Sequence, residues 1–204
     1  DWGQDLKGLK KYIEANDVTD VVLSYYGITD PHHYGIDYQD MVVSMMFNRT
    51  GGINSLEPKK EILAVSVNNL QSSYFYDKHL FDWLKKIKPI AKIGYSIFIY
   101  DITNDTISHE RLAQIYHNSG WDGESERHCL RLLKLDHNNP VALFTLSCIN
   151  ARFDRYELAA DYFEIFLNSR DPDFVPVNLS LINYGSYQLK SSREALLDGY
   201  YRSL

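Results

Sequence analysis

The sequence predicts a chain of two parts, an α/β part over residues 1–102 and an all-α part over residues 103–204. Two observations predict this division. Before residue 102, helical spacing of apolar residues alternates with runs of Val, Ile, Leu and Ala that are typical of strands buried on both faces. After Ile102, the apolar residues keep helical spacing and recur with a period of about 34 residues, which is the pattern of stacked helical hairpins.

The α/β part begins with an amphipathic helix, because five apolar residues recur at helical spacing: Trp2, Leu6, Leu9, Tyr12 and Ile13. Strands are predicted at 20–27, 61–71 and 91–100, and a helix at 78–87 that Pro89 ends. A strand, a helix and a strand in succession form the crossover unit of a parallel sheet. We therefore expect a small Rossmann-like parallel sheet with flanking helices.

The stretch 37–60 fits no single element. Its segment MVVSMMF, at 41–47, is compatible with a helical turn or with an additional strand. The following NRTGGINSLEPKK, at 48–60, has the Gly, Pro and Asn content of a loop. The GGINS run within it lacks the Lys followed by Ser or Thr that a phosphate-binding loop needs.

Two units of paired helices are predicted over about residues 108–174. When the chain is aligned with itself at an offset of 34 residues, six pairs of residues occupy equivalent positions: Leu112 with Leu146, Gly120 with Asp154, Ser125 with Ala159, Cys129 with Phe163, Leu132 with Phe166 and Leu133 with Leu167. The period resembles that of tetratricopeptide repeats. The chain departs from their pattern at Ser125, where alanine is usual, at His137, where proline is usual, and at Asp154, where glycine is usual. Further helices at about 177–190 and 193–203 are expected to close the stack.

Composition and charge exclude several classes of protein. The formal net charge of -6 argues against an extended nucleic-acid surface, which needs clustered Lys and Arg. Lys85, Lys86 and Lys88 form a local basic group, which we interpret as a solvated helix end. No apolar run approaches the roughly 20 residues that span a bilayer, and no secretory signal is recognisable. The sequence predicts a soluble fragment as it stands.

Five blocks of residues 1–102 carry a family resemblance. They are DWGQDL (1–6), LSYYGITDPHHYGI (23–36), AVSVNNLQ (64–71), FDWL (81–84) and PIAKIGYSIFIYDI (89–102). In this order they resemble the soluble C-terminal region of multispanning membrane glycosyltransferases, the family of protein O-mannosyltransferases and related lipid-carrier-dependent enzymes. Some such proteins continue into tetratricopeptide repeats.

The resemblance implies a domain cut just beyond a membrane. In that family the DWGQDL segment follows shortly after the last transmembrane helix, and the catalytic carboxylate lies in an extracytoplasmic loop near the first transmembrane helices. That loop has no counterpart here, so no catalytic residue is assigned. The implied location is extracytoplasmic, with the membrane-embedded portion of the same polypeptide as the principal partner.

Polar residues at the expected carboxyl ends of the three strands are the strongest candidates for ligand binding. Ligands of open α/β sheets collect there, and tyrosines and amides suit a sugar or a lipid-linked sugar. The alternative is that these side chains tie loops together. The candidates are Tyr25, Tyr26 and Asp30 after the first strand, Asn68, Asn69 and Gln71 after the second, and Tyr100 and Asp101 after the third, with Asp1, Trp2, Gln4 and Asp5 as further members.

Other motifs give weaker indications. His32 and His33 lie beside Asp30, but adjacent histidines point in different directions and no third ligand follows at zinc-site spacing, so no metal is predicted. A role for His33 in acid-base chemistry or ligand binding stays open. Asp171 and Asp173 spell the DxD of nucleotide-sugar enzymes, although their position after a repeat helix speaks against that role.

The sequence leaves three functional hypotheses. The first is a noncatalytic extracytoplasmic domain that recognises an acceptor or partner. The second is an independent sugar-acting enzyme at the strand ends, and the third is a pure protein-binding scaffold. Gln114, His117 and Asn150 are the candidates for a groove that holds a peptide or protein ligand. Cys129 and Cys148 are expected to be free, buried thiols, and no cofactor is predicted.

Overall fold

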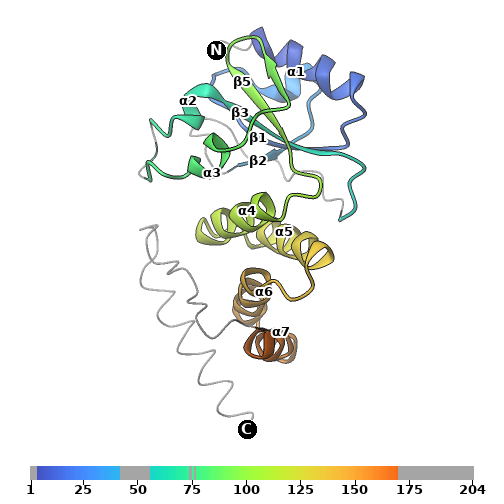
Figure 1. Cartoon of the computed structure of the whole chain (residues 1–204), viewed down its shortest axis with the longest axis vertical. Helices are drawn as coiled ribbons and strands as arrows, with labels where there is room; N and C mark the ends of the chain where they lie inside the picture. Colours follow the sequence, from blue (N-terminus) through green and yellow to red (C-terminus); the bar gives the residue numbers. More distant parts are fainter. Residues whose placement is uncertain (1–3, 42–55, 74, 76, 170–204) are drawn as a thin grey trace. The chain divides into compact units, whose positions relative to one another are not determined.

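The computed structural model describes residues 4–41, 56–73, 75 and 77–169. The chain divides into two compact units, Asp1–Asp105 and Thr106–Leu204. The described part of the first unit combines a sheet with helices, and that of the second is helical (Figure 1). The fold is therefore mixed α/β with mostly helical content. The expected helices at about 177–190 and 193–203, the DxD motif and residues 42–55 lie outside the described residues.

The first unit begins with the expected amphipathic helix and builds a sheet of five strands. Its elements in chain order are α1 (Gln4–Ala15), β1 (Asp20–Ser24), the 3-10 helix η1 (Pro31–Tyr34), β2 (Gln39–Asp40), β3 (Glu61–Ser66), α2 (Val67–Leu70), α3 (Asp82–Lys85), β4 (Ala91–Ile93) and β5 (Ile97–Asp101). The strands expected at 20–27 and 61–71 are present as the shorter β1 and β3. After β2, the backbone N–H of Met41 still donates to the carbonyl of Leu23 in a bond of 2.9 Å.

The sheet is mixed, and the expectation of a parallel sheet was wrong for its second half. The strand order is β2-β1-β3-β5-β4. Strand β1 pairs in parallel with β2 and with β3, where Val22 lies opposite Leu63. Strand β5 pairs antiparallel with β3, where Ala64 lies opposite Ile99, and antiparallel with β4. The carboxyl end of β5 therefore lies at the opposite end of the sheet, along the strand direction, from the carboxyl ends of β1 and β3.

Strand β5 runs antiparallel to β3 because the chain turns inside the predicted strand 91–100. Gly94 adopts φ +53°, a left-handed conformation that favours glycine. A Cβ atom at Gly94 would also collide with the Asp5 carboxylate, so a side chain has no room there. The turn folds the segment into a hairpin in which Ile93 pairs with Ile97. The apolar content of AKIGYSIFIY predicts strand correctly but hides the reversal of direction.

The helix predicted at 78–87 is confined to the four residues of α3. Upstream, the Asp77 carboxylate accepts a hydrogen bond from the His79 backbone N–H at 2.8 Å, and residues 78–81 form a turn. Phe81 and Leu84 are fully buried, as the helical spacing predicts, whereas Ile87 is 38% exposed. The apolar pattern thus identifies the buried residues better than it identifies the helix length.

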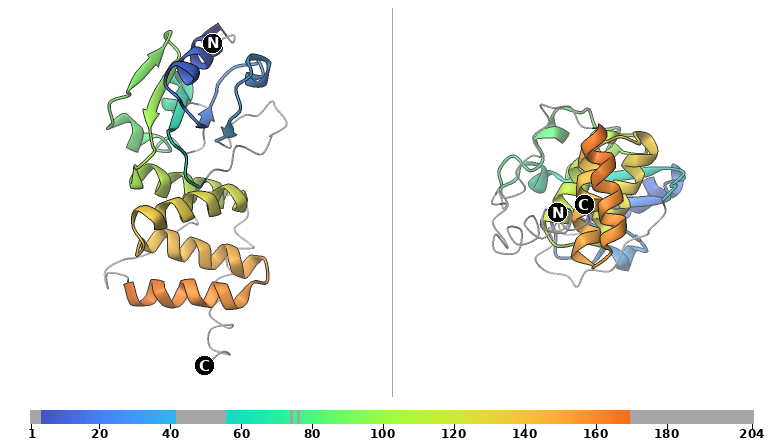
Figure 2. Two further views of the ribbon diagram at one scale, coloured as in Figure 1. Left: turned by 90° about the vertical axis from the view of Figure 1, so that its right-hand side faces the viewer. Right: turned by 90° about the horizontal axis from the view of Figure 1, so that it is seen from below.

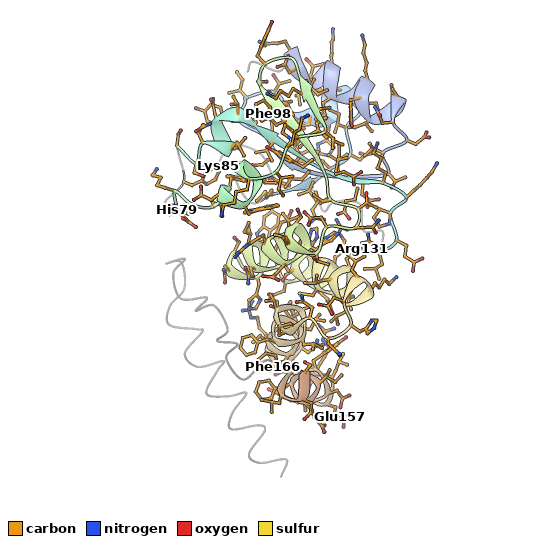
Figure 3. All side chains as sticks on the ribbon, in the orientation of Figure 1. His79, Lys85, Phe98, Arg131, Glu157 and Phe166 are labelled. Carbon is orange, nitrogen blue, oxygen red and sulfur yellow. The ribbon has the colours of Figure 1, made fainter. Side chains whose placement is uncertain are left out.

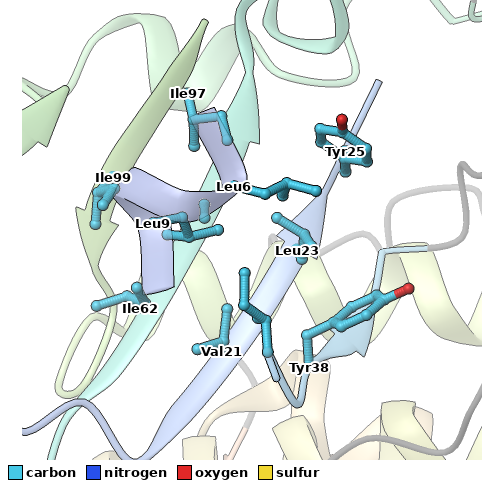
Figure 4. Close-up of a cluster of buried hydrophobic side chains, with 11 residues drawn as sticks. Leu6, Leu9, Val21, Leu23, Tyr25, Tyr38, Ile62, Ile97 and Ile99 are labelled. Atoms are coloured by element: carbon cyan, nitrogen blue, oxygen red, sulfur yellow. The ribbon is translucent and has the colours of Figure 1, made fainter. Parts of the chain in front are cut away.

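The core of the first unit lies between α1 and one face of the sheet (Figure 4). Leu6 and Leu9 of α1 have no exposed surface, and they pack on alternate residues of the strands. Those strand residues are Val21, Leu23, Ile62, Ala64, Ile97 and Ile99. The intervening Val22, Leu63 and Val65 are buried as well, so the central strands are covered on both faces.

The second unit contains two helical hairpins, the second of which repeats the first (Figure 2). The first consists of α4 (Thr106–Asn118) and α5 (Asp122–Leu135), and the second of α6 (Pro140–Arg152) and α7 (Tyr156–Ser169). The bounds of α6 and α7 follow those of α4 and α5 at one constant offset, which is the period of about 34 residues expected from the sequence. The repeat is therefore present in the backbone.

The turn within each hairpin repeats too. Gly120 and Asp154, at equivalent positions of the two hairpins, both have positive φ, +77° and +58°. The Trp121 N–H donates to the Tyr116 carbonyl at 2.9 Å, and the Arg155 N–H donates to the Asn150 carbonyl at the same distance. The asparagine-like tolerance of aspartate for the left-handed region explains how Asp154 replaces the turn glycine.

Replacing the turn glycine tests this conformation. No atom lies within 4 Å of a Cβ built at Gly120 or at Gly123, so neither substitution by alanine meets a steric clash. Gly120→Ala places a Cβ in the left-handed region and should lower the free energy of unfolding by about 1 kcal/mol. Gly123→Ala, in the first turn of α5, should not lower it. Urea denaturation measures both, and an equal effect would contradict the assigned backbone.

Candidate functional site

The carboxyl ends of β1 and β3 share one edge of the sheet, and polar side chains meet there. The Asn69 Nδ2 atom donates to the Ser24 Oγ atom at 3.0 Å. The Ser66 Oγ atom accepts from the Tyr26 backbone N–H at 2.9 Å. Asn69 is only 1% exposed. These bonds connect the segments that follow the two strands, which is the loop-tying role left open by the sequence.

Asp5 joins this edge from α1. Its Oδ2 atom accepts from the Ser96 Oγ atom at 2.6 Å and from the Ser96 backbone N–H at 3.2 Å. The Ser96 carbonyl in turn accepts from the Val67 N–H at 2.7 Å, directly after β3. One carboxylate therefore links the first helix, the β4–β5 hairpin and the end of β3. We call Asp5, Ser24, Ser66, Asn69 and Ser96 the sheet-end cluster.

Tyr25 lies at the same end of β1 and carries an unusual phenol group. The side chain is 8% exposed, and its Oη atom is buried with no hydrogen-bond partner among the described residues. Burial raises the pKa of Tyr25 to about 12, and the nearby Tyr34 phenol and Asp5 carboxylate act in the same direction. The phenol is thus neutral across the physiological range and cannot serve as a base there.

The remaining candidates near this edge differ in accessibility. Tyr26 is 37% exposed, Gln4 and Gln71 are exposed, and Asn68 is half-buried. Asp1 and Trp2 lie outside the described residues. The groups that can reach a ligand at this edge are therefore Tyr26, Asn68 and Gln71, whereas Asn69 and Tyr25 are enclosed.

Asp30 and His33 have a local structural role. Asp30 caps η1, because its Oδ1 atom accepts from the His32 backbone N–H and lies 2.9 Å from the His32 Nδ1 atom. The backbone hydrogen bond from His32 is the main reason that the pKa of Asp30 is lowered. His33 is exposed, and its Nδ1 atom lies 3.9 Å from Asp30. The two histidines therefore serve one capping carboxylate.

Tyr100 and Asp101 do not join the sheet-end cluster. Because β5 is antiparallel to β3, Asp101 lies opposite Ile62 at the beginning of β3. Tyr100 is 3% exposed, and burial raises its pKa. The expectation that all three strands deliver ligand-binding residues to one edge was wrong for these two residues, for the same reason that the parallel sheet was.

Asp101 instead borders an open hollow of about 710 Å³ at the opposite edge. The Asp101 Oδ1 atom accepts from the Thr103 hydroxyl at 2.6 Å, and Lys59 lies 3.7 Å from the exposed carboxylate of Asp17. The lining is polar throughout: Asn16, Asp17, Lys59, Lys60, Asp101, Thr103, Asn104 and Asp105. Such a wall offers hydrogen bonds, but it contains no cysteine, serine or histidine nucleophile.

Two of the three expected groove residues are buried in the helical unit. His117 is 3% exposed and Asn150 has no exposed surface; the Asn150 Nδ2 atom donates to the Leu146 carbonyl at 2.7 Å. Gln114 is half-buried and accepts from Arg111 Nη1 at 3.3 Å. Only Gln114 therefore lies where a ligand could contact it. His117 and Asn150 are better placed to hold the hairpins together.

His117 belongs to a buried polar network that connects the two hairpins. Its Nδ1 atom lies 3.1 Å from Asp122 Oδ1, and Arg152 Nη1 lies 2.5 Å from Asp122 Oδ2. Burial alone raises the pKa of Asp122, but the hydrogen bond with His117 and the charge of Arg152 outweigh burial and lower it. Asp122 therefore remains ionised and links the end of α4, the beginning of α5 and the end of α6.

The two thiols are unsuited to nucleophilic chemistry at neutral pH. Both cysteines are free, as expected, with Cys129 buried and Cys148 half-buried. Burial raises the pKa of each to about 12, so the reactive thiolate form is scarce.

Several residues that shape these sites were missed from the sequence. Ser24 and Ser66 are the last residues of β1 and β3, Ser96 lies in the turn before β5, and Asp122 begins α5. A serine at the end of an apolar run is a signal for a turn or a cap, which could have indicated the first two. The partners of Asp122 are 5 and 30 residues away in the chain, so no local pattern predicts that network.

The comparisons with known proteins identify no relative. No family model matches the chain, no curated protein matches it, and no solved structure matches it. Among the helices that the structure describes, none is long and apolar enough to cross a bilayer.

Tyr25→Phe tests the unpaired phenol. Because the variant removes a buried hydroxyl that has no partner among the described residues, the free energy of unfolding should stay unchanged or rise by up to about 1 kcal/mol. Ser96→Ala is the contrasting variant, since it removes a hydrogen bond to a carboxylate and should cost about 1.5–3 kcal/mol. Denaturant titration of both proteins measures the difference, and a clear loss in Tyr25→Phe would reveal a partner.

Asp122→Asn tests the network between the hairpins. The folded pKa of Asp122 is lowered, so its stabilising contribution is present above the unfolded pKa of about 3.9 and is lost as the pH falls toward the folded value. The variant should be less stable than the wild type by about 1–3 kcal/mol at neutral pH, and this difference should shrink below about pH 4. Denaturation between acid and neutral pH measures it. The exposed Asp161→Asn on α7 is the control, and it should show no comparable pH-dependent difference.

Proposed function

We propose that this chain is the extracytoplasmic recognition domain of a membrane glycosyltransferase, noncatalytic by itself, and that it positions an acceptor or a protein partner for chemistry in the membrane-embedded portion. The observation that carries the proposal is the repeat of the α4–α5 hairpin as α6–α7 at one constant offset along the chain. Stacked helical hairpins of this length are the architecture of tetratricopeptide domains, whose common use is binding peptides and proteins.

The enclosed polar groups support a noncatalytic role. Asn69 and Asp5 are held by serine partners, and the Tyr25 phenol is buried. Both thiols have a raised pKa. In the part of the chain that the structure describes, these groups contact neighbouring protein segments or are enclosed by them. The assignment of the parent enzyme rests on the resemblance of the five blocks in residues 1–102.

The outer surface of α4 is the surface that we assign to the partner. Ile107 is 56% exposed, Arg111 is exposed, and Gln114 is half-buried. Their spacing of four and then three residues places all three on one side of the helix. An apolar side chain, a guanidinium and an amide together suit an extended peptide, which offers backbone carbonyls and carboxylates to hydrogen-bond donors.

The test uses the full-length parent protein with Arg111→Glu and Gln114→Ala combined. Loss of two contacts to an acceptor should raise its KM by about tenfold while kcat changes little, because binding is lost without damage to the catalytic group. Glu157→Lys, an exposed residue on α7, is the control. Steady-state transfer assays on membranes provide both constants.

Three outcomes would contradict the proposal. An unchanged acceptor KM in the double variant would remove the recognition role. Turnover of sugar substrates by the isolated chain would make it an enzyme in its own right. A parent reading frame without a series of membrane-length apolar segments would remove the glycosyltransferase assignment.

A further inference from the structure

The segment that runs from α3 into β5 is rich in lysine and lacks acidic residues. Residues 83–100 contain four lysines, Lys85, Lys86, Lys88 and Lys92, and no acidic residue. The chain as a whole carries a formal net charge of -6. This segment is therefore basic within a chain whose net charge is negative.

Three of these lysines have no compensating charge nearby. Lys85 Nζ lies 2.7 Å from Asp82 Oδ1, and this hydrogen bond is the main reason that the pKa of Asp82 is lowered. Lys86, Lys88 and Lys92 are exposed and make no ion pair with any residue that the structure describes. Lys92 places its Nζ atom 4.6 Å from the centre of the Phe98 ring. The uncompensated charge thus belongs to Lys86, Lys88 and Lys92.

Exposed isoleucines alternate with these lysines. Ile87 is 38% exposed and Ile90 is 50% exposed. The Ile90 N–H donates to the Ile99 carbonyl at 2.8 Å, which extends the pairing of β4 by one residue. Side chains alternate along a strand, so Ile90 and Lys92 project to the same face, opposite to Ala91 and Ile93, which pack on the core. Figure 3 labels two residues of this segment, Lys85 at the end of α3 and Phe98 on β5.

We propose that Lys86, Ile87, Lys88, Ile90 and Lys92 form a docking surface for an anionic lipid bilayer. Lysines attract the negative headgroups, and isoleucines enter the boundary between headgroups and acyl chains. Single exposed apolar residues are common on proteins, but two of them within a basic segment that lacks acidic residues have the composition of an interfacial segment. Charge complementarity suits an anionic lipid surface and an acidic protein alike. The two accessible isoleucines favour the lipid surface.

This inference deepens the proposed function, because a domain tethered to a membrane enzyme gains a fixed orientation from a second contact with the bilayer. It does not depend on the identity of the acceptor. A basic surface within an acidic chain also orients the approach, since the remaining acidic surface is repelled by anionic headgroups.

The test is flotation of the chain 1–204 with vesicles of phosphatidylcholine, with and without phosphatidylglycerol. Binding should require phosphatidylglycerol and should weaken as salt rises. Combined Lys86→Ala, Lys88→Ala and Lys92→Ala should weaken binding by about 100-fold, at about fivefold per lysine. The control removes the same charge from exposed lysines elsewhere, Lys7→Ala, Lys11→Ala and Lys134→Ala, and should change binding by less than about fivefold. Thermal unfolding of each variant verifies that it is folded.

A second pair of variants separates insertion from charge attraction. Ile87→Ser with Ile90→Ser should lower the binding that persists at high salt, whereas Ile165→Ser, at a residue of α7 that is 44% exposed, should not. The proposal is overturned if the wild type does not bind phosphatidylglycerol vesicles at low salt, if both lysine variants lose binding equally, or if the chain binds soluble polyanions but not vesicles. Any of these results leaves the acceptor KM test unaffected, so the two proposals fail separately.

Discussion

The hydrogen bonds between the Asp5 carboxylate and Ser96 are the constraint on which the first unit depends. They join α1 to the hairpin that reverses the chain after β4, and the same hairpin places β5 antiparallel to β3. Gly94 is required beside Asp5 because a Cβ atom would meet the carboxylate. Hydrogen bonds to a carboxylate are stronger than hydrogen bonds between neutral groups, and Asp5 accepts two of them from Ser96. These bonds hold the short turn that precedes β5.

The sequence predicted the positions of most elements and of the buried residues. Leu6, Leu9 and Phe81 are buried as their spacing predicts, and the hairpins follow the period of the apolar residues. These features depend on local periodicity, which is visible in one sequence. The pairing direction of β5 follows from the turn at Gly94, and the glycine within the apolar run was a local signal for it. The Asp5–Ser96 contact joins residues 91 positions apart, so no local pattern contains it. The helix at 78–87 was overestimated in length, since residues 78–81 form a turn and the helix is confined to Asp82–Lys85.

The candidate site was predictable only in part, for a related physical reason. Residue type and position after a strand identified Asn69 and Tyr26 as polar groups at one end of the sheet, and Asp5 was a further candidate from the first helix. Whether such a group binds a ligand or a neighbouring loop depends on its burial, and Asn69 is enclosed while Tyr26 is not. In the helical unit, His117 was expected in a groove, but its pairing with Asp122 places it inside. A buried polar group without such a partner would cost stability. Buried polar side chains therefore bond a neighbouring segment more often than they bind a ligand.

Strand β4 lies at one edge of the sheet, and edge strands offer unpaired backbone groups to other chains. This strand is only three residues long, and its outward side chain is a lysine. A second molecule that added a strand there would bring its own Lys92 close to the first, and the two ammonium groups would repel each other. The lysine thus disfavours the pairing of two copies of the chain through this edge.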